Sequence, residues 1–135
     1  MRYKIIHALM AASTFIATFA AASLWAHHSP SAIFDMAKPM SVTGTLTKID
    51  WINPHILVQM DAQGEGGKVE HWTFESNPPS WYRKVGLARA DLAQALGKTV
   101  TVGGVRARDG SLFGYMLKIK MPDGTSLELV LSEIK

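Results

Sequence analysis

The alternation of apolar and polar residues that begins at Ser41 constrains the fold of this chain more than any other sequence feature. Within Ser41–Trp51 the alternation first places Val42 and Leu46 on one face. It then shifts phase, so that Ile49 and Trp51 take the inward positions. A phase change inside a glycine-containing strand is typical of a bulged and strongly coiled strand. Such a strand bends enough to serve both sides of a small barrel.

The rest of the chain predicts further strands around a helical connection. Asn53-Pro54 predicts the turn after the first strand, and Asp109-Gly110 predicts a tight hairpin turn. Alternation places Met60, Trp72 and Phe74 in the core. The expected strands are 41–51, 55–61, 68–75, 99–108, 112–121 and 126–134, and the expected helical pieces are 80–86 and 91–96.

The expected elements are three strands, a helical connection, two further strands and a last strand. This is the order of the OB-fold. We therefore predict a mainly β protein, a small OB-like Greek-key barrel of five to six strands with one helical connection, over residues 41–135. A β-sandwich is the alternative, but the helix between the third and fourth strands argues against it. Residues 27–40 lack periodicity and are expected to form an N-terminal arm.

Residues 1–26 predict a secretory signal peptide. Arg2 and Lys4 give a positive start, and an apolar stretch rich in small residues then ends at Ala26. Cleavage there would leave His27 as the first residue of the mature chain, whereas cleavage after Ala22 is the alternative. A retained membrane helix is the competing interpretation, since the stretch is long enough to span a bilayer. We expect a periplasmic or secreted protein without a stable membrane anchor after processing.

Charge and motifs exclude several classes of function. Arg2 and Lys4 supply two of the three net positive charges, which leaves the mature domain at +1 and predicts no nucleic-acid partner. The absence of cysteine excludes disulfides, thiolate metal sites and thiol catalysis. No hydrolase motif is present, and we therefore expect a protein that is not an enzyme, although copper redox chemistry stays open.

Four short segments of the chain resemble one family. They are AHHS after the leader, GTLTKIDWINPH, WTFES and VTVGGVRARDGS. Together they are similar to DUF6152, a family of small exported bacterial proteins of unknown function, over essentially the whole mature chain. The resemblance implies export and a compact β fold, and it carries no established activity. The matching positions are His27, His28, Ser29, Trp51, Asn53, Pro54 and His55.

Four histidines of the mature chain form a candidate metal site: His27, His28, His55 and His71. A free amine at His27 would chelate together with the imidazole of that residue, and another imidazole would complete a three-nitrogen set suited to Cu(II). Since His55 and His71 lie on the outward face of neighbouring strands, either could meet the arm. We predict binding of copper or another transition metal, with Asn53 and Glu75 nearby. The structural alternatives are that His27 and His28 belong only to a solvated arm, that His55 is only a turn residue, and that His71 is only a cross-strand neighbour.

The aromatic residues support a second hypothesis, a module of the cell envelope that binds a small ligand or a protein. OB barrels often bind ligands on the face of their second and third strands. Trp51 and Trp72 are predicted to point inward, whereas Trp81 and Tyr82 on the helical connection are predicted to form an exposed contact patch. The sequence decides neither the oligomeric state nor the partner.

Overall fold

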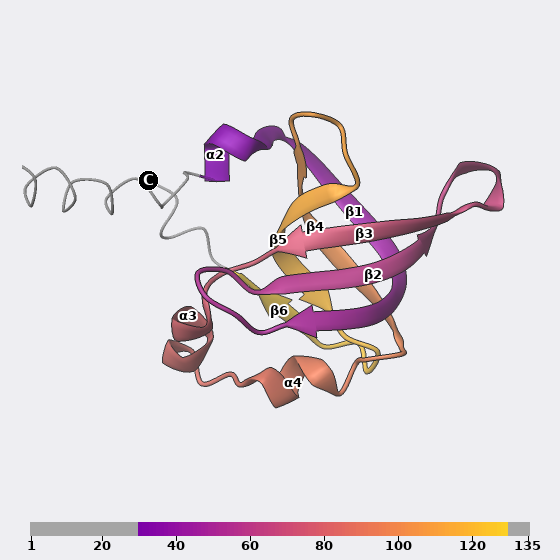
Figure 1. Ribbon diagram of the computed structural model, residues 1–135. Helices are drawn as coiled ribbons and strands as arrows, with labels where there is room; N and C mark the ends of the chain where they lie inside the picture. The colour runs from indigo at the N-terminus through magenta and orange to yellow at the C-terminus, as the bar shows by residue number, and fades with distance from the viewer. Residues whose placement is uncertain (1–29, 130–135) are drawn as a thin grey trace, which may run out of the picture.

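The computed structural model describes residues 30–129, which form six strands joined by short helices (Figure 1). The predicted signal peptide, His27 and His28 lie outside the described residues, as do residues 130–135. In chain order the elements are α2 (Pro30–Ile33), β1 (Phe34–Asp50), β2 (Leu57–Gln63), the 3-10 helix η2 (Glu65–Gly67), β3 (Val69–Glu75), α3 (Pro79–Lys84), α4 (Arg89–Ala93), β4 (Thr99–Ala107), β5 (Phe113–Lys120) and β6 (Ser126–Glu128).

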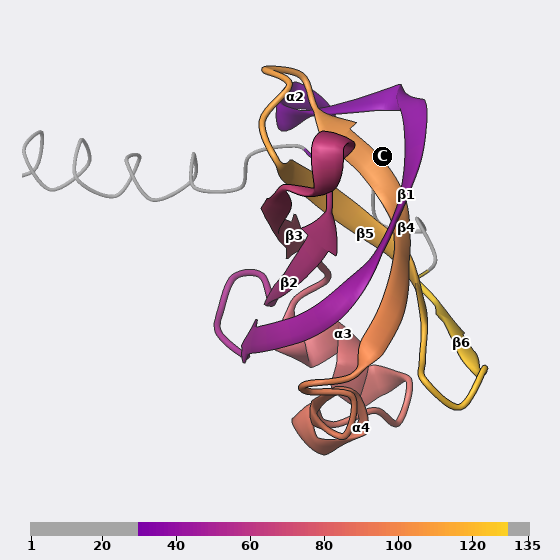
Figure 2. The same ribbon diagram turned by 90° about the vertical axis from the view of Figure 1, so that its right-hand side faces the viewer.

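The sheet closes into a barrel because β5 pairs with β3 as well as with β4. The strands follow the order β3-β2-β1-β4-β5-β6, and a short parallel pairing of Thr73–Glu75 with Phe113–Tyr115 joins the two ends of the five-stranded part. β6 pairs with the remaining length of β5. Figure 2 shows α3 and α4, which connect β3 to β4, together at one end of the barrel. This topology confirms the predicted OB-like barrel and excludes the sandwich.

The long first strand carries the bulge that the phase change predicts. The register of β1 against β2 shifts between Leu46 and Lys48. β1 begins at Phe34, seven residues before the expected Ser41, and therefore takes in half of the residues predicted to form the arm. The alternation is hidden there because the register of β1 against β4 is irregular between Phe34 and Pro39.

The apolar residues form two clusters on opposite faces of the β4–β5 part of the barrel wall. The main cluster fills the barrel and includes the predicted core residues Met60, Trp72 and Phe74. The second cluster lies on the other face of β5, where Phe34 is fully buried with its ring centroid 5.1 Å from that of Phe113 and 5.5 Å from that of Tyr115. The beginning of β1 is thereby fixed to the outside of the barrel.

Candidate functional site

His55 lies in the loop between β1 and β2, directly after Asn53-Pro54. Its Nδ1 atom lies 3.0 Å from the carbonyl oxygen of Ser76 and 3.3 Å from a carboxylate oxygen of Glu75. Both oxygens accept hydrogen bonds, so Nδ1 carries a hydrogen and donates it, and Nε2 is the ring nitrogen that neither oxygen engages. Histidines that bind metals are typically held in this way, with the second ring nitrogen bonded to a carbonyl or carboxylate.

The backbone behind His55 is held by hydrogen bonds that extend the β2–β3 pairing. The N–H of Ser76 donates to the carbonyl oxygen of Ile56 at 2.9 Å, and the N–H of Ile56 donates to that of Asn77 at 3.4 Å. The buried hydroxyl of Ser76 lies 2.6 Å from the hydroxyl of Tyr82. The carbonyl that orients His55 is therefore part of a rigid frame.

The same frame predicts a loss of stability in alkaline solution. Burial raises the pKa of Tyr82 to about 12 from its usual 10. As pH rises above 10, the unfolded chain loses the phenol proton before the folded chain does. The free energy of unfolding should then fall by about 1.4 kcal/mol per pH unit up to pH 12. Urea titrations at several pH values check this, and Tyr82→Phe should remove that part of the pH dependence. An equal slope in both proteins would contradict it.

A chain of aromatic and amide contacts links the N-terminal segment to the His55 frame. The ring of Phe34 packs against Tyr115, whose hydroxyl donates to the side-chain oxygen of Asn77 at 2.7 Å. Tyr115 is also the pairing partner of Glu75 across β3 and β5. The segment that follows residue 29 is thus anchored on the side of the barrel that carries His55.

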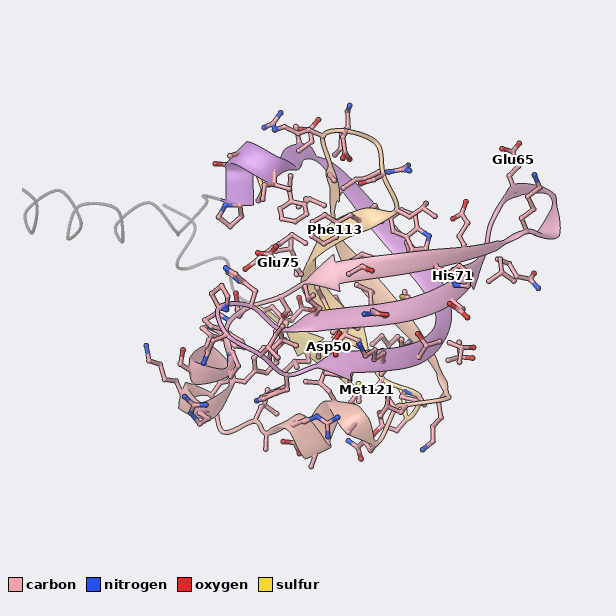
Figure 3. The ribbon with its side chains drawn as sticks, viewed as in Figure 1. Asp50, Glu65, His71, Glu75, Phe113 and Met121 are labelled. Atoms are coloured by element: carbon pink, nitrogen blue, oxygen red, sulfur yellow. The ribbon has the colours of Figure 1, made fainter. Side chains whose placement is uncertain are left out.

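His71 is placed elsewhere on the β2–β3 surface. Its Nδ1 atom lies 2.7 Å from a carboxylate oxygen of Asp61, and the His71 side chain is 79% exposed. Figure 3 shows His71 and Glu75 toward opposite ends of β3. The register sets Asp61 opposite His71 and Leu57 opposite Glu75, so a rise of about 3.3 Å per residue puts His71 and His55 roughly 20 Å apart. The structure does not bring these two histidines together.

The remaining predicted residues have mixed outcomes. Asn53 is exposed beside His55, and Trp81 is partly buried. The predicted exposure of Tyr82 is wrong, because its ring is fully buried between Trp51 and Trp81, 5.1 and 5.2 Å away between centroids. Within residues 30–129 no three His, Asp or Glu side chains gather as a metal cluster.

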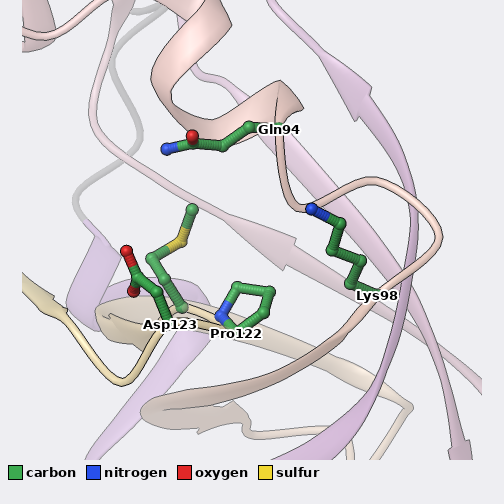
Figure 4. Close-up of a pocket in the computed structure, with 5 residues that line it drawn as sticks. Gln94, Lys98, Pro122 and Asp123 are labelled. Carbon is green, nitrogen blue, oxygen red and sulfur yellow. The ribbon is translucent and has the colours of Figure 1, made fainter.

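Sequence reasoning missed a cleft between α4 and the turn that joins β5 to β6. The cleft has a volume of about 230 Å³ and adjoins a smaller hollow of about 60 Å³ (Figure 4). Asp91 lines the cleft and Asp123 lines the smaller hollow, and both carboxylates already accept hydrogen bonds from nearby backbone N–H groups. Bonds from Thr125 also hold the pKa of Asp123 below its usual value. The cleft is lined by Leu87, Asp91, Leu92, Gln94, Met121, Thr125, Ser126 and Leu127.

The closed ring of five strands, with its helical connection between β3 and β4, defines an OB-like β-barrel protein. The chain belongs to the DUF6152 family, a family of unknown function whose sequence profile matches residues 15–116. That match confirms the resemblance found in the four sequence segments. A search of curated proteins finds no match to the chain.

Among the solved structures that match the chain is one with a similar fold. It is Rim1, a mitochondrial single-stranded DNA binding protein from S. cerevisiae, with 15% sequence identity and a TM-score of 0.45. The similarity covers 63% of this chain and 93% of the Rim1 chain.

None of the helices within the described residues is long and apolar enough to cross a membrane.

Proposed function

We propose that this protein is exported, loses residues 1–26, and binds copper between its new N-terminus and His55. The observation that carries this proposal is the orientation of the His55 ring. Nδ1 is engaged by the carbonyl of Ser76 and the carboxylate of Glu75, so Nε2 is the nitrogen left for a metal. We propose a binding role rather than a catalytic one.

The proposed ligand set consists of nitrogen atoms. A chain that starts at His27 supplies its α-amine and its own Nδ1, and Nε2 of His55 completes a T-shaped set. Cu(II) prefers tetragonal nitrogen ligation and binds such ligands more tightly than the other divalent metals of its row. His28, the next residue, is the alternative third ligand. The amine has a pKa near 8, so copper has to displace a proton from it at neutral pH.

The anchoring of the N-terminal segment supports the proximity that the site needs. Phe34 is fixed against Tyr115, and Ser31 is held by a 3.2 Å hydrogen bond from Arg108 to its carbonyl oxygen. Residues 27–29 then span at most about 10 Å when extended. The proposed site needs this reach to extend from the segment held by Arg108 and Tyr115 to the His55 loop, behind which Tyr115 bonds to Asn77.

The charge of the barrel surface favours a cation over a polyanion. β2 and β3 contain no lysine or arginine, and their outward positions carry the carboxylates of Asp61 and Glu75. A negative surface attracts cations and repels the phosphates that supply most of the affinity for nucleic acids. We therefore propose a metal ion and not a nucleic acid as the ligand of this face.

A small-molecule ligand is the second candidate, and the observation that favours it is the cleft beside α4. Its volume of about 230 Å³ is below the range of roughly 300–1,000 Å³ that is usual for small-molecule sites. Copper binding at His55 remains the first proposal for this reason.

Two matched histidine variants test the copper proposal. The exported protein is first sequenced from its N-terminus to establish that it begins at His27. In competition titrations with Cu(II), His55→Ala should weaken binding at least about tenfold, since one of three ligands is lost. His71→Ala should change the affinity less than about twofold, since that ring lies roughly 20 Å from His55. Equal effects of the two substitutions would contradict the assigned site.

A further inference from the structure

Apolar residues of α3 and of the loop between β1 and β2 meet at Tyr82, whose ring contacts Trp51 and Trp81. Figure 1 shows this loop beside α3. Both tryptophan rings are partly buried against the core, and the more exposed apolar side chains lie next to them in the chain. Ile52 is 53% exposed and Val85 is 50% exposed. Val85 lies one turn after Trp81, since its N–H donates to the Trp81 carbonyl oxygen at 3.2 Å, so the two share one side of the helix. We call Trp51, Ile52, Trp81 and Val85 the α3 patch.

The chain around the α3 patch is basic. Between Glu75 and Asp91 it contains Arg83, Lys84 and Arg89 and no acidic residue. Arg83 and Lys84 are exposed in the last turn of α3, directly beside the patch. Asp50, which precedes Trp51, is paired with Lys48 at 2.9 Å. The α3 side of the barrel therefore combines exposed apolar groups with the positive charge of Arg83 and Lys84, whereas the outer face of β2 and β3 carries Asp61 and Glu75.

We propose that the α3 patch docks the protein reversibly onto the surface of an anionic phospholipid bilayer. Tryptophan rings favour the headgroup level of a membrane, where one edge is apolar and the other is wet. Ile52 and Val85 bury their exposed apolar groups among the upper acyl chains. Arg83 and Lys84 contact the acidic headgroups, which attract basic residues within a short distance of the surface.

The same charges disfavour a second copy of the chain as the occupant of the patch. In a two-fold symmetric dimer the same surface faces itself, so Arg83 and Lys84 of one protomer would lie near those of its partner. Like charges placed together across an interface oppose association. A lipid surface has the complementary charge. This inference does not depend on copper binding at His55.

Sedimentation with lipid vesicles tests the proposal on the exported protein, after its mass has shown that the leader is removed. The wild type should bind vesicles of equal parts phosphatidylglycerol and phosphatidylcholine, with a blue shift of its tryptophan fluorescence, and should bind pure phosphatidylcholine far more weakly. The double variant Ile52→Ser/Val85→Ser should lose roughly tenfold or more of this binding. The double variant Arg83→Gln/Lys84→Gln should lose a similar factor of vesicle affinity, and its binding should depend much less on salt.

Val69→Ser is the matched control, because Val69 is 59% exposed on β3 and lies outside the patch. Its vesicle binding should equal that of the wild type, and circular dichroism should show that all variants are folded. Equal binding to both lipid compositions, no binding to either, or equal losses in Val69→Ser and the patch variants would overturn the proposal. A wild-type protein that forms a dimer and binds no vesicles would also overturn the proposal, if Ile52→Ser/Val85→Ser dissociates that dimer.

Discussion

Replacing Gly104 with alanine is expected to lower the free energy of unfolding by at least about 3 kcal/mol. A Cβ atom at this position would overlap the carbonyl oxygen of Tyr115 and would lie 3.0 Å from its carbonyl carbon. Both atoms belong to the backbone of β5, which is held by β4 on one edge and by β3 on the other. The strand cannot move away without breaking the contact that closes the barrel.

Gly103→Ala is the matched control for Gly104→Ala. A Cβ at Gly103 would meet only the Cβ of Lys118, at an ordinary distance of 3.7 Å. We expect a change within about 0.5 kcal/mol, or a small gain, since alanine restricts the unfolded chain more than glycine does. Urea unfolding followed by tryptophan fluorescence measures both variants. Similar losses in the two would show that the close approach of β4 and β5 is not the cause.

Phe34→Ala is expected to cost about 3–5 kcal/mol of stability. The side chain is fully buried against Phe113 and Tyr115, and alanine would leave a cavity between the N-terminal segment and β5. Thermal unfolding measures this loss, with Ile33→Ala as the control. Ile33 is 36% exposed, so its truncation should cost less than about 1 kcal/mol.

The Phe34 variant also bears on the proposed copper site. In the proposed site the segment would no longer be held against Tyr115, so His27 would no longer be directed toward His55, and Cu(II) affinity should fall with stability. A loss of stability below about 1 kcal/mol in Phe34→Ala would mean that this segment is not an integral part of the barrel. The proposed proximity of His27 and His55 would then have no support from the packing of Phe34.

The barrel could be predicted because its core obeys a period of two residues that the sequence displays directly. Met60, Trp72 and Phe74 alternate with polar residues on paired strands, and the bulge near Leu46 appears as a change of phase. The start of β1 at Phe34 could not be read in this way, because an irregular register interrupts the alternation. Tyr82 was misplaced because α3 has only six residues, too few to display a helical period.

The candidate site was only partly visible in the sequence. His55 and Glu75 could be selected by residue type and by their outward positions on the strands expected from the sequence. The carbonyl of Ser76 and the bond from Tyr115 to Asn77 were missed, because they depend on the β2–β3 register and on the pairing of β3 with β5. Such contacts join residues far apart in the chain and leave no local pattern.

Pulsed EPR of the Cu(II)-loaded exported protein tests the central claim most directly. For a chain that begins at His27, we predict coupling to two imidazoles, of which one is lost in His55→Ala, whereas both persist in His71→Ala. A form that retains residues 23–26 should lose the contribution of the terminal amine of His27. Spectra that are identical in the wild type and His55→Ala would contradict the account, because the ring held by Ser76 and Glu75 would then not be a copper ligand.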